Sequence, residues 1–482
     1  MEASKRGIVV AIMLAMVLAA VETTVVTIAV PTIVKDLNGF ELVSWVFSLY
    51  LLTASVSTPI YGKLADLYGR KNTLSVGIII FLIGSFACGL SQNMYHLMAF
   101  RGVQGLGAGA IYTITYTIVG DQFSLSERAK VQGWLSSIWG ISSLIGPFIG
   151  GVIIDMLSWH WIFFVNIPFG IISILLIQKY VKESFEKKEV VLDYKGVISL
   201  SIGIIALLLT FMSNGKDYNI QYLRTGFCGI IAIVSLAIFY KVEKKAKEPV
   251  MPFEIFDRSN ILINAISFIF SAVLMGIDVY MAIYIQNVLE YNATVSGLIM
   301  APMSITWFLA AFFIGDKIVK YGEKSIIVFS GIPITIGTLF IFMLGVNSSI
   351  FSVVLFSAIL GIGFGLNFTT LTIVIQMSVD YNKRGAATAS NTLLRNLGQT
   401  IGISVFGSIF NFSILRYLRS LNIFNISPNA MYSGNIIDGI SKSVVKESLN
   451  FSLHIVFFIM IILDVFAIVL SIMIPNMVKN DK

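Results

Sequence analysis

The sequence predicts an all-α membrane protein with fourteen transmembrane helices, and three features support this fold class. Hydrophobic residues make up 56% of the 482 residues, while Asp, Glu, Lys and Arg together make up 12%, about half the charged fraction of a soluble domain. The apolar residues fall into fourteen blocks, each long enough to cross roughly 30 Å of hydrocarbon. The first six and the last six blocks also carry similar motifs in the same order. A water-soluble fold and a sizeable soluble catalytic domain are therefore excluded, and we expect no enzyme.

Charged residues separate the apolar blocks and give approximate limits for the helices. The expected spans are 8–31, 42–61, 73–90, 97–119, 132–154, 160–178, 196–212, 223–240, 261–285, 294–314, 325–344, 349–375, 386–410 and 451–474.

The basic residues indicate how these helices are oriented. The two termini and the loops after even-numbered helices hold 24 of the 33 Lys and Arg residues, and the opposite loops hold seven. Because cytoplasmic loops carry the excess of Lys and Arg, we expect both termini to be cytoplasmic, in a multi-pass protein of the cytoplasmic membrane. This bias explains the net charge of +7 without nucleic acid as a partner.

Segments of the two halves match at nearly constant offsets. The run from Gly105 to Gly109 corresponds to Gly361–Gly365, 256 positions later, and Gly146 and Gly402 are the same distance apart. The turn from Gly62 to Lys71 matches Gly315 to Lys324 at an offset of 253. Glu22 and Asp278 are again 256 positions apart.

The repeat predicts the domain organisation. Residues 1–182 are expected to form one six-helix bundle and residues 259–482 a second, with a long external loop at 411–450 that is either an amphipathic cap or loosely ordered. Residues 183–258 hold an inserted pair, helices 7 and 8. Since six is an even number, both bundles have the same orientation, which is the plan of parallel-repeat transporters.

Four motifs occur in order along the chain. They are Glu22-Thr-Thr-Val-Val-Thr-Ile-Ala-Val-Pro31, Gly62-Lys-Leu-Ala-Asp66-Leu-Tyr-Gly69-Arg70-Lys71, Arg101-Gly-Val-Gln104-Gly105-Leu-Gly107 and Gly146-Pro147-Phe-Ile-Gly150-Gly151. Together they resemble the signatures of the major facilitator superfamily, and specifically its fourteen-helix drug/proton antiporter branch. The resemblance covers nearly the whole chain and implies the major facilitator fold: two six-helix bundles plus two inserted helices.

The chain departs from the family pattern at two positions. The acid of the first helix is usually Asp, whereas Glu22 is one methylene longer. Ser142 stands where the helix 5 motif often has glycine, so we expect slightly looser packing there.

Ionisable residues inside the spans are candidates for proton coupling, because each costs about 2.5–3.5 kcal/mol to insert into a membrane. Glu22 lies 16 residues after Arg6, roughly 24 Å along a helix, which places it in the outer half of the membrane. Arg101 enters from outside and could approach Glu22. We expect Glu22 to carry the proton and bind cationic drugs, with Asp278 as the second acid and Arg101 tuning the acid. Asp464 is a further candidate, although a structural ion pair with Arg395 is the alternative.

The turn from Gly62 to Lys71 is expected on the cytoplasmic face. Gly62 and Gly69 permit a tight turn, Asp66 can accept from a helix N-terminus or a cation, and Arg70 and Lys71 can meet that acid or lipid phosphates. The resemblance implies a latch that holds the cytoplasmic side closed, and a basic loop that only sets topology is the alternative.

The helix 5 motif, formed by Gly146, Pro147, Gly150 and Gly151, removes side chains from one face and one backbone hydrogen bond. Small residues let helices approach closely in lipid. At the bundle interface such a hinge would prevent leakage, and an ordinary packing face is the alternative.

The substrate site is the least specific part of the prediction. Aromatic and amide side chains suited to flat cations are Tyr112, Tyr116, Trp139, Tyr280, Tyr284, Trp307, Asn367, Gln376 and Asn391. The three histidines fall near outer helix ends without metal-ligand spacing, and Cys88 and Cys228 are expected to be buried thiols. No cofactor or metal is expected.

The favoured function is export of lipophilic, cationic drugs or antiseptics in exchange for protons, by a monomer in contact with membrane lipid. ATP use is not expected because no G-x-x-x-x-G-K-[ST] loop occurs. Three alternatives stay open: a narrow exporter of one antibiotic, lipid or metabolite; an uptake symporter; and a passive channel or membrane sensor.

Overall fold

A computed structural model describes residues 3–39, 42–123, 125–181, 193–211, 218–246, 253–379, 384–423 and 441–475. Every regular element in these residues is helical, which confirms the all-α fold class. Each of the predicted spans falls on a described helix. Ten described helices are long and apolar enough to cross a membrane, so fourteen remains the predicted number of crossings.

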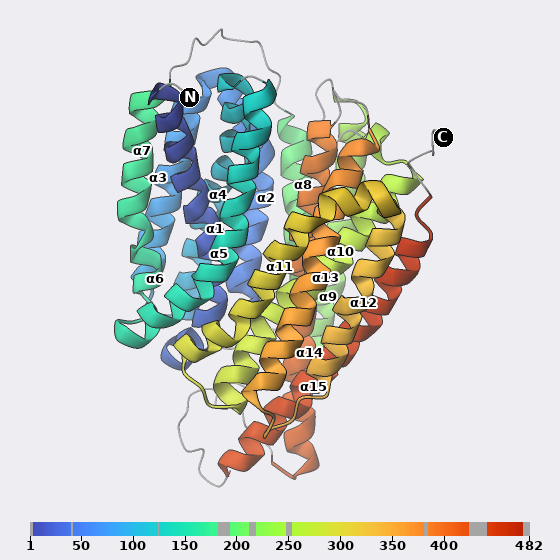
Figure 1. Cartoon of the computed structure of the whole chain (residues 1–482). Helices are drawn as coiled ribbons and strands as arrows, with labels where there is room; N and C mark the ends of the chain where they lie inside the picture. Colours follow the sequence, from blue (N-terminus) through green and yellow to red (C-terminus); the bar gives the residue numbers. More distant parts are fainter. Residues whose placement is uncertain are drawn as a thin grey trace. The chain divides into compact units, whose positions relative to one another are not determined.

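The chain divides into two compact units (Figure 1). The first contains Met1–Ile33, Trp45–Thr210 and Asn214–Val250, and the second contains Val34–Ser44, Phe211–Ser213 and Met251–Lys482. The predicted helices 7 and 8 fall mostly within the first unit, and their identification as an inserted pair at 183–258 stays a prediction.

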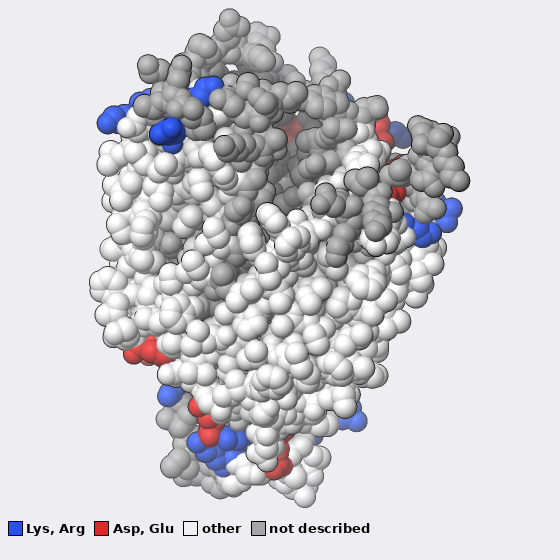
Figure 2. All heavy atoms as spheres, viewed as in Figure 1, with Lys and Arg blue, Asp and Glu red and all other residues white. Residues whose placement is uncertain are grey.

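The helices of the first unit are α1 (Ala3–Leu37), α2 (Val43–Tyr68), α3 (Arg70–Gly89), α4 (Met94–Gln122), α5 (Leu125–Met156), α6 (Trp161–Phe164), α7 (Asn166–Tyr180), α8 (Tyr194–Phe211) and α9 (Tyr218–Glu243). Those of the second are η2 (Phe253–Ile255), α10 (Arg258–Ile283), the π-helical turn η3 (Tyr284–Val288), α11 (Ala293–Tyr321), α12 (Glu323–Phe342), α13 (Ile350–Met377), α14 (Arg384–Ser420) and α15 (Lys442–Ile472). Figure 2 shows white, uncharged faces along both units, with the visible Lys, Arg, Asp and Glu toward the helix ends.

Glycines bring α4 against α2 and, in the second unit, α13 against α11. A Cβ added to Gly105 would meet Thr53 Oγ1 and the carbonyl of Tyr50. One added to Gly361 would meet the corresponding atoms of Thr306 and Met303, which lie 253 positions after Thr53 and Tyr50. The repeat is therefore a repeat of packing as well as of sequence.

The contact between α3 and α4 repeats in the same way. A Cβ on Gly107 would meet the backbone of Phe81 and Gly77, and a Cβ on Gly363 would meet that of Ile334 and Ser330. Residues of α12 lie 253 positions after their counterparts in α3, and residues of α13 lie 256 positions after their counterparts in α4.

The turns after α2 and α11 also have the same backbone. Gly69 has φ 86° and ψ 151°, and Gly322, 253 positions later, has φ 79° and ψ 149°. Only glycine adopts this region readily, which explains both glycines.

One pair of sequence matches is not consistent with the packing. A Cβ on Gly146 of α5 would meet Thr24 of α1, whereas one on Gly402 of α14 would meet Ala272 of α10. A uniform offset of 256 would instead place Gly402 against Tyr280, two helical turns away. The predicted matches Glu22–Asp278 and Gly146–Gly402 therefore cannot both be structural equivalences, because glycine spacing alone does not fix the register of two helices.

The predicted external loop at 411–450 is shorter than expected. Helix α14 continues to Ser420 and α15 already begins at Lys442, and these ends extend past the other helices of the second unit in Figure 1. Hydropathy misses them because helical segments outside the membrane need no long apolar block. The rest of that loop lies outside the described residues.

An ion cluster holds the start of α15. Glu290, with φ 63°, accepts hydrogen bonds from Lys442 and from Lys446, whose Nζ is 2.7 Å from Oε2. These two hydrogen bonds hold the pKa of Glu290 below its ordinary value of 4.5, and the bond from Lys442 has the larger effect. The acid also offsets two cations at a helix N-terminus, where positive charge is unfavourable.

We expect Gly105→Ala to destabilise the first unit by about 1–3 kcal/mol, because the new methyl group forces the α2 backbone away. Gly102→Ala in the same helix is the matched control, since its Cβ would lie 3.9 Å from Thr53 Cγ2 with no closer neighbour. Thermal unfolding in detergent measures both variants, and equal melting temperatures would contradict the close contact.

We expect Glu290→Gln to lower stability by about 1 kcal/mol or less, as for other solvent-exposed ion pairs. A lowered pKa means that this stabilisation is fully present above the ordinary pKa of 4.5 and is lost as the pH falls through the folded-state value. The difference in melting temperature between the variant and the wild type should thus be present at neutral pH and vanish in acid. A difference that persists in acid would exclude the ionised carboxylate as its source.

Candidate functional site

A buried ion pair joins α1 and α4 in the interior of the first unit. Arg101 Nη1 lies 2.6 Å from Glu22 Oε1, and the two residues are 1% and 2% exposed. The approach of Arg101 to Glu22, predicted from the depth of both residues in their spans, is confirmed.

The second oxygen of Glu22 is bound by α7. Asn166 Nδ2 donates to Glu22 Oε2 at 2.6 Å and also lies 3.0 Å from Ser85 Oγ on α3. The Ser85 hydroxyl in turn donates to the carbonyl of Phe163 at 2.8 Å. Each carboxylate oxygen of Glu22 therefore has a donor from a different helix.

Arg101 is held by α2 and by its own helix. Its Nη1 donates to Gln104 Oε1 at 2.8 Å and its Nε to the carbonyl of Val46 at 3.3 Å. The guanidinium group lies over the Tyr50 ring at 4.1 Å, and the Tyr50 hydroxyl is 3.3 Å from that of Tyr112. These contacts keep the cation in place whether or not Glu22 is charged.

The arrangement couples protonation to helix position. Protonating Glu22 removes the negative charge and leaves Arg101 buried without its counter-ion, and breaking a buried pair in this way costs about 3–5 kcal/mol. A proton on Glu22 therefore favours a state in which α1 and α4 separate or water reaches the guanidinium group.

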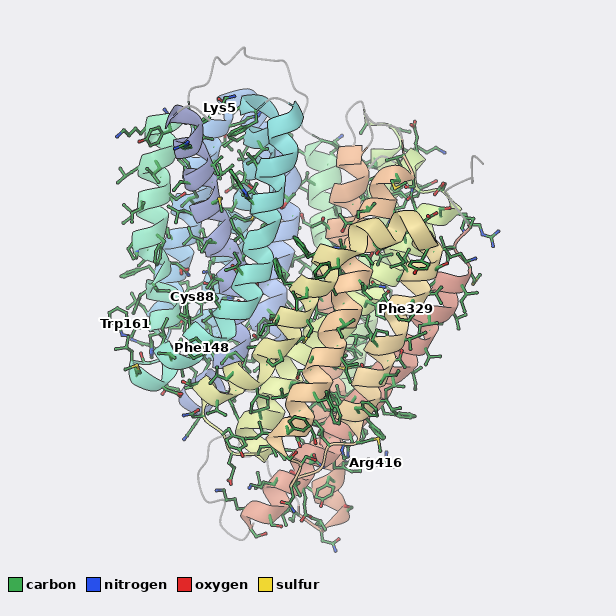
Figure 3. All side chains as sticks on the ribbon, in the orientation of Figure 1. Lys5, Cys88, Phe148, Trp161, Phe329 and Arg416 are labelled. Carbon is green, nitrogen blue, oxygen red and sulfur yellow. The ribbon has the colours of Figure 1, made fainter. Side chains whose placement is uncertain are left out.

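The buried thiol predicted at Cys88 adjoins this network. Its Sγ is 3.8 Å from Gln104 Oε1, and Figure 3 shows Cys88 within the first unit, whereas Trp161 projects outward. Cys228 is also buried.

The ionisable residues of the second unit do not form a corresponding pair. Arg395 donates from Nη2 to the carbonyl of Phe368 at 3.1 Å and to Thr372 Oγ1 at 3.0 Å. Asp464 is 0% exposed, and neither of its carboxylate oxygens has a hydrogen-bond partner among the described residues. The ion pair between Arg395 and Asp464, considered as an alternative, is therefore wrong. Asp278 is partly buried on α10.

The predicted substrate residues are distributed over both units. Tyr280 packs on Phe410 with ring centroids 5.2 Å apart, and Tyr284 donates to the carbonyl of Gly345 at 2.7 Å. Trp307 stacks against two phenylalanines of α13, Phe364 and Phe368, which also stack on each other.

The remaining members lie on several helices. Asn391 donates to Asn264 Oδ1 at 2.8 Å and thereby links α14 to α10, while Asn367 donates to Ser330 Oγ at 2.8 Å. Tyr116 is exposed, and the side chains of Trp139 and Gln376 lie outside the described part of the chain. Their substrate role stays a prediction.

The turn after α2 has a partner that the sequence did not indicate. Lys71 Nζ donates to the carbonyl of Gln178 at 2.7 Å, near the C-terminus of α7, where a cation is favourable. The expected contacts of Lys71 with Asp66 and with lipid phosphate stay predictions. The Asp66 side chain lies outside the described residues, while Gly62 has only an ordinary contact with Thr113.

The helix 5 glycines contact α1 of their own unit. Added Cβ atoms on Gly146 and Gly150 would meet Thr24 and Val25, and the carbonyl of Ser142 accepts from Thr24 Oγ1 at 3.2 Å. This is the close packing face that was weighed against the hinge. It connects α5 to the helix that carries Glu22, two residues before Thr24. The side chain of Pro147 is not among those described, and Gly151 is buried.

Sequence reasoning missed the uncharged members of the Glu22 network: Ser85, Gln104 as a ligand of Arg101, and Asn166. The sequence indicates Gln104 only as a member of the motif from Arg101 to Gly107. An asparagine within the apolar span 160–178 was the available signal for Asn166, since polar side chains in lipid need a partner.

Comparisons with known proteins identify relatives along almost the whole chain. Multidrug resistance protein 3 of Bacillus subtilis (strain 168) is 32% identical over 434 residues, which cover 90% of this chain and 83% of that protein. Multidrug transporter protein MdtP of the same strain is 35% identical over 410 residues, covering 85% and 76%. Multidrug efflux pump SdrM of Staphylococcus aureus (strain N315) is 31% identical over 413 residues, covering 83% and 89%.

Solved structures show the same fold at low identity. A bacterial homologue of the human lysosomal transporter Spinster has a TM-score of 0.69 at 13% identity, covering 98% of this chain and 97% of that one. A D-xylose–proton symporter has a TM-score of 0.64 at 12% identity, covering 95% and 97%. The family model described as Major Facilitator Superfamily matches residues 12–403. Because this family model matches most of the chain, and because the helices are apolar and their packing is repeated, the chain belongs to the major facilitator superfamily and is a membrane transporter.

Proposed function

We propose that this protein is a proton-coupled antiporter that exports lipophilic, cationic compounds across the cytoplasmic membrane by alternating access. The observation that carries the proposal is the buried Glu22–Arg101 pair, since a titratable acid inside a membrane is a functional group in most proteins that keep one. Three relatives named for multidrug resistance, transport or efflux support drugs as substrates. Both termini are placed in the cytoplasm on the basis of the Lys and Arg distribution.

The proposed cycle uses the network as a proton switch. With Glu22 charged, Asn166 and Arg101 bind its two oxygens and hold α1 against α4 and α7. A proton from outside neutralises Glu22 and weakens these contacts, so that the helices can rearrange. Release of the proton inside restores the charged carboxylate, for which Arg101 and a cationic drug then compete.

The energetics are sufficient for accumulation. One elementary charge moving inward at 100 mV releases about 2.3 kcal/mol, which corresponds to nearly a fiftyfold gradient of a neutral solute. Exchange of one monovalent cation for one proton moves no net charge, so it is driven by the pH gradient, and the membrane potential contributes only when further protons enter. Asp278 is retained in the proposal as a second acid, with Arg101 tuning Glu22. The domain plan with α8 and α9 as an inserted pair, and a monomeric state, are part of the same proposal.

The test uses everted membrane vesicles that carry a pH gradient, to which ethidium is added. We expect ethidium to collapse part of the gradient in the wild type and to have no effect in Glu22→Gln, because the amide binds no proton. Proton-driven ethidium export that is intact in Glu22→Gln would contradict the assignment. A substrate-independent, unsaturable current would instead indicate a channel.

Glu22→Asp should keep coupling but weaken it. The shorter acid can still take up a proton, but it cannot reach both Arg101 and Asn166, and one lost charge-assisted hydrogen bond is worth about 1.5–3 kcal/mol. The same vesicle assay should therefore give a lower rate by about tenfold or more. A rate equal to that of Glu22→Gln would mean that titratable chemistry at this position is not sufficient.

The latch proposal concerns the first turn only, because the second turn has Val319 where the first has Asp66. We expect Asp66→Asn to lower the export rate about tenfold, by removing a charge-assisted interaction of about 1.5 kcal/mol from the cytoplasm-closed state. Val319→Asn is the matched control and should leave the rate unchanged. Equal effects of the two variants would contradict a latch in the first turn.

A further inference from the structure

The Ser85–Asn166 contact of the first unit has a counterpart in the second. Ser85 lies four residues before the end of α3, and Thr338, 253 positions later, lies four residues before the end of α12. Asn166 of α7 approaches Ser85, and Asp464 of α15 is adjacent to Thr338. Asn166 and Asp464 are 298 positions apart.

Other contacts give the same register for α7 and α15. Gly170 packs on Leu82 of α3, and Ile468, which is 298 positions after Gly170, packs on Gly331 of α12. Gly331 is within about one helical turn of the residue that corresponds to Leu82. The two pockets are therefore equivalent by packing, and an acid replaces an amide in the second.

The second pocket has no equivalent of the arginine. At the offset of 256 that relates α4 to α13, Arg101 corresponds to Ser357 and Gln104 to Leu360. Both residues are buried. Neither side chain can compensate a negative charge in the way that Arg101 does for Glu22.

The charged residues of the helices that pack on α15 do not pair with Asp464 either. These are Arg258 and Asp278 on α10, Glu323 and Lys324 on α12, and Arg395, Arg416 and Arg419 on α14, while the side chain of Arg384 on α14 is outside the described ones. On α15 itself, His454 Nε2 lies 2.7 Å from the carbonyl of Leu344. A carboxylate at this position would be a buried charge without a counter-ion among the described residues, which is strongly unfavourable.

The Thr338 hydroxyl beside Asp464 already has an acceptor in its own helix. Thr338 Oγ1 donates its proton to the carbonyl of Ile334 at 2.9 Å, so its lone pairs remain free to accept. In the first unit Ser85 Oγ is used in the same way: it donates to a carbonyl and lies within hydrogen-bond distance of the Asn166 amide. An amide supplies that donor as N–H, whereas an aspartate can supply it only as O–H.

We infer that Asp464 is a second proton-binding site, which holds a proton in this conformation and, as the neutral acid, offers its O–H to Thr338 Oγ1 as a hydrogen-bond donor. The step involves a proton alone: the carboxylate oxygen gains H⁺ to form the acid and loses H⁺ when the pocket opens. Because no arginine faces it, this site exchanges its proton without disrupting an ion pair. That the proton is coupled to export rests on the proposed function.

Infrared difference spectra of the purified protein test the site without any substrate. The wild type at neutral pH should show the carbonyl-stretch band of a protonated carboxylic acid, and Asp464→Asn should lose that component, whereas Glu22→Gln retains it. Asparagine is the residue at the equivalent position of the first unit, and a monodisperse elution profile confirms folding. An unchanged band in Asp464→Asn would overturn the inference.

Thr338→Val provides a second variant that keeps the acid. It should shift the Asp464 band, since the acid loses its hydrogen-bond acceptor, without removing it. A band at the wild-type position would contradict the proposed hydrogen bond.

Ethidium export from everted vesicles at a fixed membrane potential separates this inference from the proposed function. If Asp464 carries a coupled proton, Asp464→Asn should still export but reach a gradient about fiftyfold lower per 100 mV. If Asp464→Asn loses the infrared band but reaches the same ethidium gradient as the wild type, Asp464 binds a proton that is not coupled to export. Absence of proton-driven export in the wild type would contradict only the proposed function, because the infrared result does not depend on it.

Discussion

The ion pair between Glu22 and Arg101 constrains the first unit more than any other contact. Each charge would be very unfavourable alone in the interior of a membrane protein, and their attraction offsets the loss of hydration only when the remaining hydrogen-bonding groups are also bound. Asn166, Gln104 and the carbonyl of Val46 supply these contacts from three helices. The position of α1 relative to α2, α4 and α7 therefore depends on the charge of one side chain.

Close helix contacts let such a network form at a defined geometry. In lipid, association relies on packing rather than on the hydrophobic effect, and the glycines of α4 and α13 bring backbone against backbone at repeated positions. The glycines of α5 contact α1 next to Thr24 and Val25, so a displacement of α5 reaches the helix that carries Glu22. A packing face of this kind and a conformational hinge are compatible readings of the helix 5 motif.

Much of the fold could be predicted from the sequence because hydrocarbon admits few solutions. Apolar blocks marked the helices, and the depth of Glu22 and Arg101 in their spans predicted that they could meet. The prediction was less successful where no charge or hydropathy signal exists. Asn166 and Ser85 are uncharged residues in apolar spans, and the outer ends of α14 and α15 lie beyond the apolar blocks. The register of α5 against α1 differs from that of α14 against α10, because glycine spacing does not determine which turn faces a neighbour.

The comparison of the two units also changes how the second acid is identified. Sequence offsets pair Glu22 with Asp278. The packing instead pairs Asn166 with Asp464, because Asn166 lies beside Ser85 and Asp464 lies beside Thr338, the residue that corresponds to Ser85. Equivalent positions have thus diverged in charge: one unit has an acid on its first helix with an arginine opposite, and the other has an acid on its last helix with Ser357 in the place of that arginine. Glu22, which has a counter-ion, and Asp464, which has none among the described residues, need different changes in their surroundings before a proton can move. In the first case a cation has to lose its partner, and in the second a carboxylate has to meet water. Under the proposed antiport, two units built on one packing plan would therefore respond to the same proton gradient at different steps of the cycle.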